Sequence, residues 1–175
     1  KVAKKIKKIV VPSESSGKDV VKDFSLKDAS IEVVHNGIDL GFFYPSDKPY
    51  EDYKILSIAS SDVPMKGLDF MIKAFPEIKK NYPKAKLSVL GKIRKEGHTE
   101  RLINSLDLKD DINFVSGLSH SELREQYCSS HVVVIPSLYE GFGFAAAEAM
   151  ACGVPALVSD GGSLKEIVGE AGKVI

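Results

Sequence analysis

The chain has 175 residues, 43% of them apolar and 27% charged, and 24 lysines and arginines balance 24 aspartates and glutamates. This composition is typical of an ordinary globular domain and excludes an intrinsically disordered chain. The level charge provides no overall field for nucleic acid, and no apolar run approaches the roughly 18–20 residues that cross a bilayer. The two cysteines lie in no metal-ligand spacing, and we expect a reducing, cytoplasmic compartment.

Short apolar runs alternate with helical patterns along the chain. The runs predict strands over residues 6–11, 31–34, 54–59, 86–90, 112–115, 131–135 and 154–158, and a last strand within 172–175. Several runs are continuously apolar, which is typical of strands buried on both faces of a parallel sheet. Between the runs, apolar residues recur at three- and four-residue spacing, which predicts helices. The alternation predicts an α/β fold built from right-handed strand–helix–strand units.

Prolines mark two places where the regular pattern is interrupted. Pro76 lies inside the first long helical pattern, where it removes a backbone hydrogen bond and clashes with the carbonyl of Ile72. We therefore expect that helix to kink or to end early. Residues 41–52 contain two further prolines and a glycine, and they are expected to form a long exposed connection.

The segment after the predicted strand 131–135 is the richest in ligand-binding groups. Ligands of open α/β sheets bind beyond the carboxyl ends of the strands. Here Gly141 and Gly143 stand directly before an alanine-rich helical pattern. Such glycines let backbone N–H groups approach an anion, and the helix dipole favours the anion by about 0.3–1 kcal/mol. The segment therefore predicts a phosphate site.

Two carboxylates flank this predicted phosphate site. Glu140 precedes the glycines, and Glu148 follows about one turn into the helix, with a side chain that tilts back towards the helix start. A carboxylate near phosphate is repulsive unless it binds hydroxyls. The pair therefore indicates a ligand with both phosphate and vicinal diols, such as a sugar nucleotide. A purely structural helix start, or the weakly matched dinucleotide pattern Gly141-x-Gly143-x-x-Ala146, is also open.

A second group of residues follows the predicted strand 54–59. Pro64 and Gly67 mark a turn, and Lys66 projects from it at the same edge of the sheet, where a cation can neutralise phosphate. A lone lysine in such a turn is more often simply solvated. The four histidines share no ligand spacing and no Asp-x-Asp occurs, so no metal site is predicted. Walker A and nucleophile-elbow motifs are also missing.

Together these motifs resemble the C-terminal, donor-binding domain of retaining GT-B glycosyltransferases, the group 1 or family 4 glycosyltransferases. The resemblance rests on residues 33–45, 54–75 and 113–123, and most strongly on 136–155 with 159–162. It implies a Rossmann-like parallel sheet with helices on both faces, the C-terminal half of a GT-B fold. Residues 1–30 would be the tail of a preceding acceptor domain, and residues 31–175 a donor domain truncated at its C-terminus.

The resemblance also implies a role for each candidate site residue. Glu140 would hold hydroxyls of the donor sugar, and Lys66 would neutralise the leaving diphosphate. Glu148 would bind the ribose diol. The diphosphate would lie on the loop Gly141, Phe142, Gly143 and Phe144, chiefly on the last two amides, and Ser60, Ser61, Gly91, Lys92, Gly117 and Leu118 would line the nucleotide. The substrate would be a nucleotide-sugar of the UDP, GDP or ADP type, transferred with retention by leaving-group stabilisation and without a cofactor or metal.

One departure from the family pattern bears on function. Ser60-Ser61 stand where the family usually has Gly-Arg, and the loss of that arginine removes a bidentate phosphate contact. Lys92, Arg94 or Lys95 offers a replacement charge. We predict weaker nucleotide affinity than in a typical member, improved by Ser61→Arg.

Two functions of different kinds are therefore expected. The first is the donor half of a glycosyltransferase, inactive as an isolated fragment because a GT-B site lies between two domains. The alternative is a glycosyltransferase-like nucleotide-binding module without transfer activity, and an NAD-dependent oxidoreductase is disfavoured by the late glycine pair. The acceptor, a sugar, lipid or other hydroxyl compound, would bind the N-terminal domain. Lipid acceptors are common in the family, so peripheral contact of the full protein with the inner face of the membrane stays open.

Overall fold

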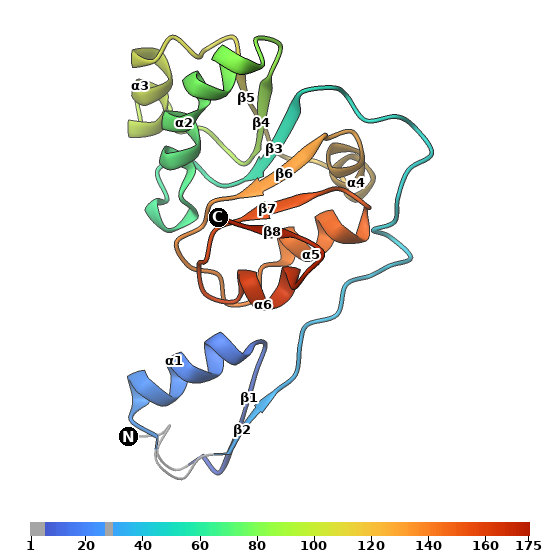
Figure 1. Ribbon diagram of the computed structural model, residues 1–175. Helices are drawn as coiled ribbons and strands as arrows, with labels where there is room; N and C mark the ends of the chain where they lie inside the picture. The colour runs from blue at the N-terminus through green and yellow to red at the C-terminus, as the bar shows by residue number, and fades with distance from the viewer. Residues whose placement is uncertain (1–5, 27–29) are drawn as a thin grey trace.

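The structure is a computed structural model that describes residues 6–26 and 30–175. Two parallel sheets are present in these ranges. β1 (Lys8–Val11) and β2 (Ser30–Val33) form a two-stranded sheet, and a six-stranded sheet has the order β5-β4-β3-β6-β7-β8. Figure 1 shows β1, α1 (Glu14–Phe24) and β2 as a small unit that an extended segment joins to the larger sheet.

The larger sheet alternates with helices along the chain. Its strands are β3 (Lys54–Ile58), β4 (Lys86–Leu90), β5 (Ile112–Val115), β6 (Val132–Ile135), β7 (Ala156–Val158) and β8 (Lys173–Val174). Between them lie η2 (Pro64–Lys66), α2 (Leu68–Asn81), α3 (His98–Ser105), α4 (His120–Cys128), α5 (Phe144–Ala151) and α6 (Leu164–Val168). The predicted α/β fold is therefore confirmed, and each predicted strand lies within two residues of its expected ends. None of these helices has the length and apolar content needed to cross a membrane.

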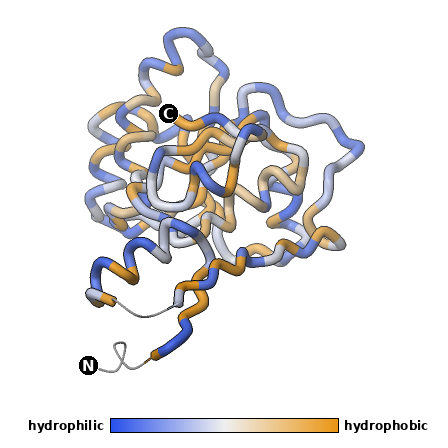
Figure 2. Tube along the Cα trace, turned by 60° about the horizontal axis from the view of Figure 1, so that its bottom comes forward, coloured by the Kyte–Doolittle hydropathy of each residue, from blue (hydrophilic) through white to orange (hydrophobic). Residues whose placement is uncertain are grey.

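The alternation of side chains along each strand divides the buried residues between the two faces of the larger sheet. Ile55 of β3 belongs to a core that includes Phe75 of α2, and its neighbour Leu56 belongs to a second core with Tyr127 of α4 and Ala146 of α5. Successive side chains of a strand point to opposite faces, so one strand contributes to both cores. Helices thus cover both faces, and the apolar stretches of the larger sheet gather in the interior of that part of the molecule (Figure 2).

Pro76 does not end its helix, so of the two expected outcomes the early end is wrong and the kink stays a prediction. α2 continues through Pro76 to Asn81. The turn before the proline carries Ile72 and Phe75, both fully buried against the sheet. Burying such side chains contributes about 1.5–3 kcal/mol each, which offsets the roughly 3 kcal/mol cost of an interior proline.

The connection between the two sheets is long. β2 pairs with β1, so the smaller sheet ends after Val33. Residues 34–53 contain no strand or helix, and residues 44–52 are mostly exposed, as predicted for residues 41–52. The boundary expected between residues 30 and 31 stays a prediction.

Candidate functional site

The strand order places the candidate site where the chain changes direction across the sheet. From β3 the chain proceeds outward to β4 and β5, then returns to β6 on the other side of β3. Such a switch point leaves a crevice beyond the carboxyl ends of the two neighbouring strands, and ligands bind there in open α/β sheets. The segment with Lys66 follows β3, and the segment with Glu140 follows β6. Both predicted groups therefore meet at this crevice.

The two loops of the crevice are packed directly on each other. The backbone N–H of Leu138 donates to the carbonyl of Met65 at 2.8 Å. Gly67 has a φ of +65°, and a Cβ there would lie 1.8 Å from the carbonyl oxygen of Pro136. Only glycine fits this position, because both the conformation and the space exclude a side chain. The close approach fixes the turn that carries Lys66.

Lys66 and Glu140 are in direct contact. The Lys66 Nζ lies 2.7 Å from Oε1 of Glu140, and the hydroxyl of Ser137 donates to the same oxygen at 2.8 Å. The side chain of Lys66 is 39% exposed and that of Glu140 is 19% exposed. An incoming anion can therefore reach the lysine, and it would compete with Glu140 for that cation.

A row of backbone N–H groups lies beside this pair. Gly143 is the N-cap of α5, with a φ of +93°. Within the described residues, the backbone N–H groups of residues 141–145 have no hydrogen-bond acceptor. Buried or half-buried backbone donors are normally satisfied, so a continuous row of open donors at a helix start is suited to an anion.

Glu148 lies on α5, with Tyr127 of α4 as its partner. The Tyr127 hydroxyl donates to Oε2 of Glu148 at 2.6 Å. Partial burial raises the pKa of Glu148, although the bond from Tyr127 acts in the opposite direction. Burial and the nearby Glu148 carboxylate raise the pKa of Tyr127, which therefore remains a donor. Oε1 of Glu148 has no partner among the described residues and can accept further hydroxyls.

The remaining predicted residues follow β3, β4 and β5 at the same edge. The Ser61 N–H donates to the carbonyl of Lys92 at 3.2 Å, and the Ser61 hydroxyl accepts from the N–H of Arg94 at 2.7 Å. Ser60 is exposed beside them, and a Cβ at Gly91 would lie 2.0 Å from the Ala59 carbonyl oxygen. The structure thus brings Ser60, Ser61, Gly91 and Lys92 together.

Gly117 and Leu118 remain apart from the other candidate residues. They follow β5, at the same edge of the sheet. In the described part of the chain they make no hydrogen bond to another candidate residue. Only their position at the same edge of the sheet supports the prediction that they belong to the site.

Two residues of the site were not identified from the sequence. Ser137 stands three positions before Glu140, and its hydroxyl is a local signal that could have been used. Tyr127 matches the helical spacing of α4, and its ring lies in the core, 1% exposed. The spacing gives no information on where its hydroxyl points. Across the described ranges, no group of three or more His, Cys, Asp or Glu is placed to hold a metal ion.

The chain resembles known proteins over nearly its whole length. Residues 44–174 match the family model described as glycosyl transferases group 1. The chain belongs to this family. It is 36% identical over 173 residues to the MMP alpha-(1->4)-mannosyltransferase of Mycolicibacterium hassiacum, a match that covers 99% of this chain and 42% of that protein.

Solved structures of a synthase and a transferase share the fold. The sucrose-phosphate synthase of Thermosynechococcus elongatus superposes with a TM-score of 0.82 at 27% identity, covering 99% of this chain and 46% of that one. A pneumococcal O-GlcNAc transferase in complex with UDP and GlcNAc superposes with a TM-score of 0.80 at 20% identity, covering 99% and 35%, a likeness that shows the fold.

These matches confirm the predicted family and fold. The chain has the Rossmann-like parallel sheet of the C-terminal half of GT-B glycosyltransferases. It spans 42% of the length of the mannosyltransferase and 46% of that of the sucrose-phosphate synthase. The roles of individual site residues remain predictions.

Proposed function

We propose that the chain is the donor-binding part of a retaining glycosyltransferase, which moves a sugar from a nucleotide-sugar to an acceptor hydroxyl. The observation that supports this most is the open row of N–H groups at residues 141–145, which follows the Lys66–Glu140 pair and precedes Glu148. Donors for phosphate, a cation and two carboxylates for hydroxyls are the groups that a nucleotide-sugar requires. The acceptor would be bound by another part of the protein.

The diphosphate of the donor would lie on the amides of Gly143 and Phe144. Its charge would draw Lys66 away from Glu140, which is 2.7 Å from the lysine in the free chain. Glu140 would then accept hydrogen bonds from hydroxyls of the donor sugar. The amides, the helix dipole and Lys66 would stabilise the charge that develops on the leaving diphosphate, which is an electrostatic form of catalysis. No side chain would act as a nucleophile.

Glu148 would bind the ribose. Tyr127 fixes one carboxylate oxygen and leaves Oε1 open among the described residues. Burial makes the charged form of Glu148 costly, as its raised pKa shows, and two ribose hydroxyls would provide the donors that compensate for lost water. A bound nucleotide would therefore improve the environment of this carboxylate.

Calorimetric titration of the chain with UDP, GDP, ADP and NAD tests the proposal. We expect saturable binding of one nucleoside diphosphate and at least a tenfold loss of affinity in Glu148→Ala, which removes charge-assisted hydrogen bonds. Glu170→Ala, at an exposed carboxylate, is the matched control and should bind as the unsubstituted chain does. Binding of NAD alone, or of no nucleotide by the folded chain, would contradict the proposal.

Ser61 supports a second candidate, a nucleotide-binding module without transfer activity. Serine is uncharged, so this position supplies no cation to the diphosphate, and its hydroxyl already accepts the N–H of Arg94. A transfer assay on the full-length protein, with the nucleotide-sugar whose base binds best, separates the candidates. Transfer supports the enzyme, and tight binding without transfer supports the module. Ser61→Arg should raise nucleotide affinity if the missing cation limits binding.

A further inference from the structure

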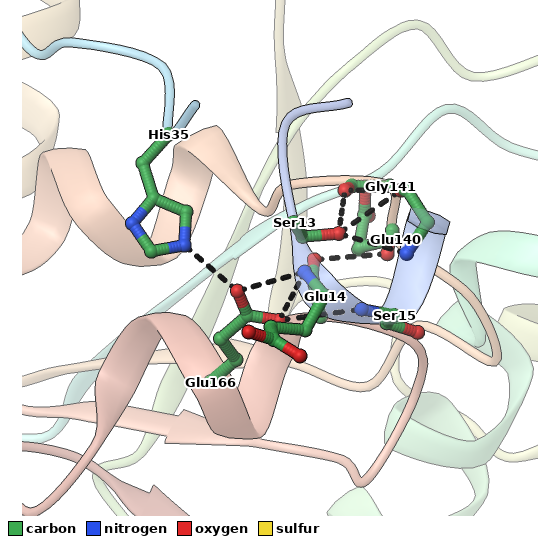
Figure 3. Close-up of polar contacts among 9 residues, drawn as sticks. Ser13, Glu14, Ser15, His35, Glu140, Gly141 and Glu166 are labelled. Carbon is green, nitrogen blue, oxygen red and sulfur yellow. Dashed lines mark hydrogen bonds and ion pairs between the residues drawn. The ribbon is translucent and has the colours of Figure 1, made fainter. Parts of the chain in front are cut away.

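The start of α1, in the small N-terminal unit, touches the loop that carries the open N–H groups. The hydroxyl of Ser13, the N-cap of α1, lies 2.8 Å from the carbonyl oxygen of Gly141 (Figure 3). The hydroxyl of Ser16 lies 2.8 Å from the same oxygen. Both hydroxyls donate, because a carbonyl oxygen only accepts. The two lone pairs of the Gly141 carbonyl are thus both used by a segment more than 120 positions away in the sequence.

Glu166 of α6 holds α1 in this position. Its carboxylate accepts the N–H of Glu14 at 3.0 Å and of Ser15 at 3.4 Å, and it lies 2.8 Å from Nε2 of His35 (Figure 3). A carboxylate at a helix N-terminus is stabilised by the open N–H groups and the helix dipole. Burial by itself raises the pKa of Glu166, but the bonds from Glu14, His35 and Ser15 outweigh it and hold the pKa below its usual value.

The two fixed carbonyls determine where the loop N–H groups point. Besides the Gly141 carbonyl, the Glu140 carbonyl is held by the N–H and the hydroxyl of Ser163, at 3.0 and 2.9 Å. In a planar trans peptide, the C=O of one residue and the N–H of the next point in opposite directions, and the described chain has no cis peptide. The N–H groups of Gly141 and Phe142 are therefore directed away from the hydroxyls that hold the loop.

We propose that Ser13 and Ser16 are positioning residues for the diphosphate site. By holding the Gly141 carbonyl they aim the Phe142 N–H into the row of open donors, and because they belong to the unit of β1, α1 and β2, the site depends on that unit being in place. This inference rests on the proposed function for the identity of its ligand. Neither serine contacts the donor in this arrangement.

Nucleotide titration of serine variants tests the inference. Ser16→Ala should weaken binding of the preferred nucleoside diphosphate about threefold, and Ser13→Ala with Ser16→Ala about tenfold, the range expected for lost hydrogen bonds. Ser16→Thr keeps the hydroxyl and should restore affinity. Ser15→Ala is the matched control, because the Ser15 hydroxyl makes no hydrogen bond among the described residues, and its affinity should be unchanged.

Ser16→Ala decides the question if the double variant fails to fold, because the N-cap bond from the N–H of Ser16 to Ser13 Oγ remains. A second readout needs no nucleotide: the amide chemical shift of Phe142 should move in Ser16→Ala and stay in place in Ser15→Ala. Affinity or a Phe142 shift equal to that of the unsubstituted chain would overturn the positioning role and leave the proposed function intact. A folded, unsubstituted chain that binds no nucleotide would overturn both.

Discussion

The two edges of the larger sheet differ in how their polar groups are used. At the amino edge, a cavity of about 360 Å³ is lined by Glu51, Lys54, Lys86 and Asp111, among others. Asp111 pairs with Lys79 at 2.9 Å and with Lys86 at 2.6 Å, and Lys54 pairs with Glu51 at 3.0 Å. At the carboxyl edge, the N–H groups of residues 141–145 have no acceptor within the described chain. The carboxyl edge, where hydrogen-bonding capacity is unused, is therefore the place of the candidate site.

The largest expected effect is that of Gly67→Ala, at the carboxyl edge. The new Cβ would lie 1.8 Å from the Pro136 carbonyl oxygen at a φ of +65°. We therefore expect the free energy of unfolding to fall by about 2–4 kcal/mol. Nucleotide binding should be lost as well. Gly117→Ala is the matched control: its φ is +73°, but nothing lies within 4 Å, and it should cost about 1 kcal/mol. Denaturant titration measures both. Equal losses of stability in the two variants would show that the positive φ, and not the contact with Pro136, determines the cost of the substitution.

Lys66→Met should separate binding from stability. We expect nucleotide affinity to fall about tenfold or more, since a charge-assisted contact to the diphosphate is lost. The free energy of unfolding should change by less than about 0.5 kcal/mol, because the Lys66–Glu140 pair is partly exposed. Lys86→Met, at the amino edge, should leave affinity unchanged in the same titration. If Lys86→Met weakened binding as much as Lys66→Met, the distinction between the edges would fail.

Asp111→Asn should lower stability by about 1 kcal/mol at neutral pH without affecting nucleotide affinity. Burial alone raises the pKa of Asp111, but the bonds from Lys86 and Lys79 outweigh it and hold the pKa below its ordinary value. A lowered pKa stabilises the fold above the unfolded-state pKa of about 3.9, and this contribution is lost as pH falls through the folded-state pKa. Thermal unfolding should therefore show a gap between variant and parent at pH 7 that narrows below about pH 4.

Glu148→Gln is expected to have the smallest effect on stability and the opposite pH dependence. Burial raises the pKa of Glu148. The carboxyl group therefore stabilises the fold below the unfolded-state pKa of about 4.3, and this stabilisation is lost as pH rises through the folded-state pKa. At pH 7 the glutamine variant should melt at the same temperature as the parent or slightly above it, and the advantage should disappear near pH 4. Its nucleotide affinity should nevertheless fall. A variant that loses stability at pH 7 would assign Glu148 to the core.

The sequence was sufficient for the fold and for one loop of the site, because both depend on local patterns. Continuous apolar runs gave strands such as β4 and β5 at their observed bounds. Glu140, the glycines and Glu148 lie within one short segment, so their proximity follows from chain connectivity. For Lys66 the sequence placed the residue at the correct edge, and the structure shows its contact with Glu140.

The rest depends on contacts between distant segments. Ser13 and Gly141 are 128 positions apart, and Glu14 and Glu166 are 152 positions apart; neither pair carries a local signal. Pro76 does not end α2 for a related reason, because the burial of Ile72 and Phe75 against the sheet outweighs the local cost of the proline. Local propensity is a weak guide wherever tertiary burial is large.

The contact between Gly67 and Pro136 also bears on how the site moves. The bond from the Leu138 N–H to the Met65 carbonyl joins the same two loops, and a Cβ has no space between them. The loops therefore cannot slide past each other while the sheet is intact. Any microsecond-to-millisecond opening of the crevice must carry both as one body, and relaxation dispersion should report a single exchange rate for the amides of Lys66 and Leu138.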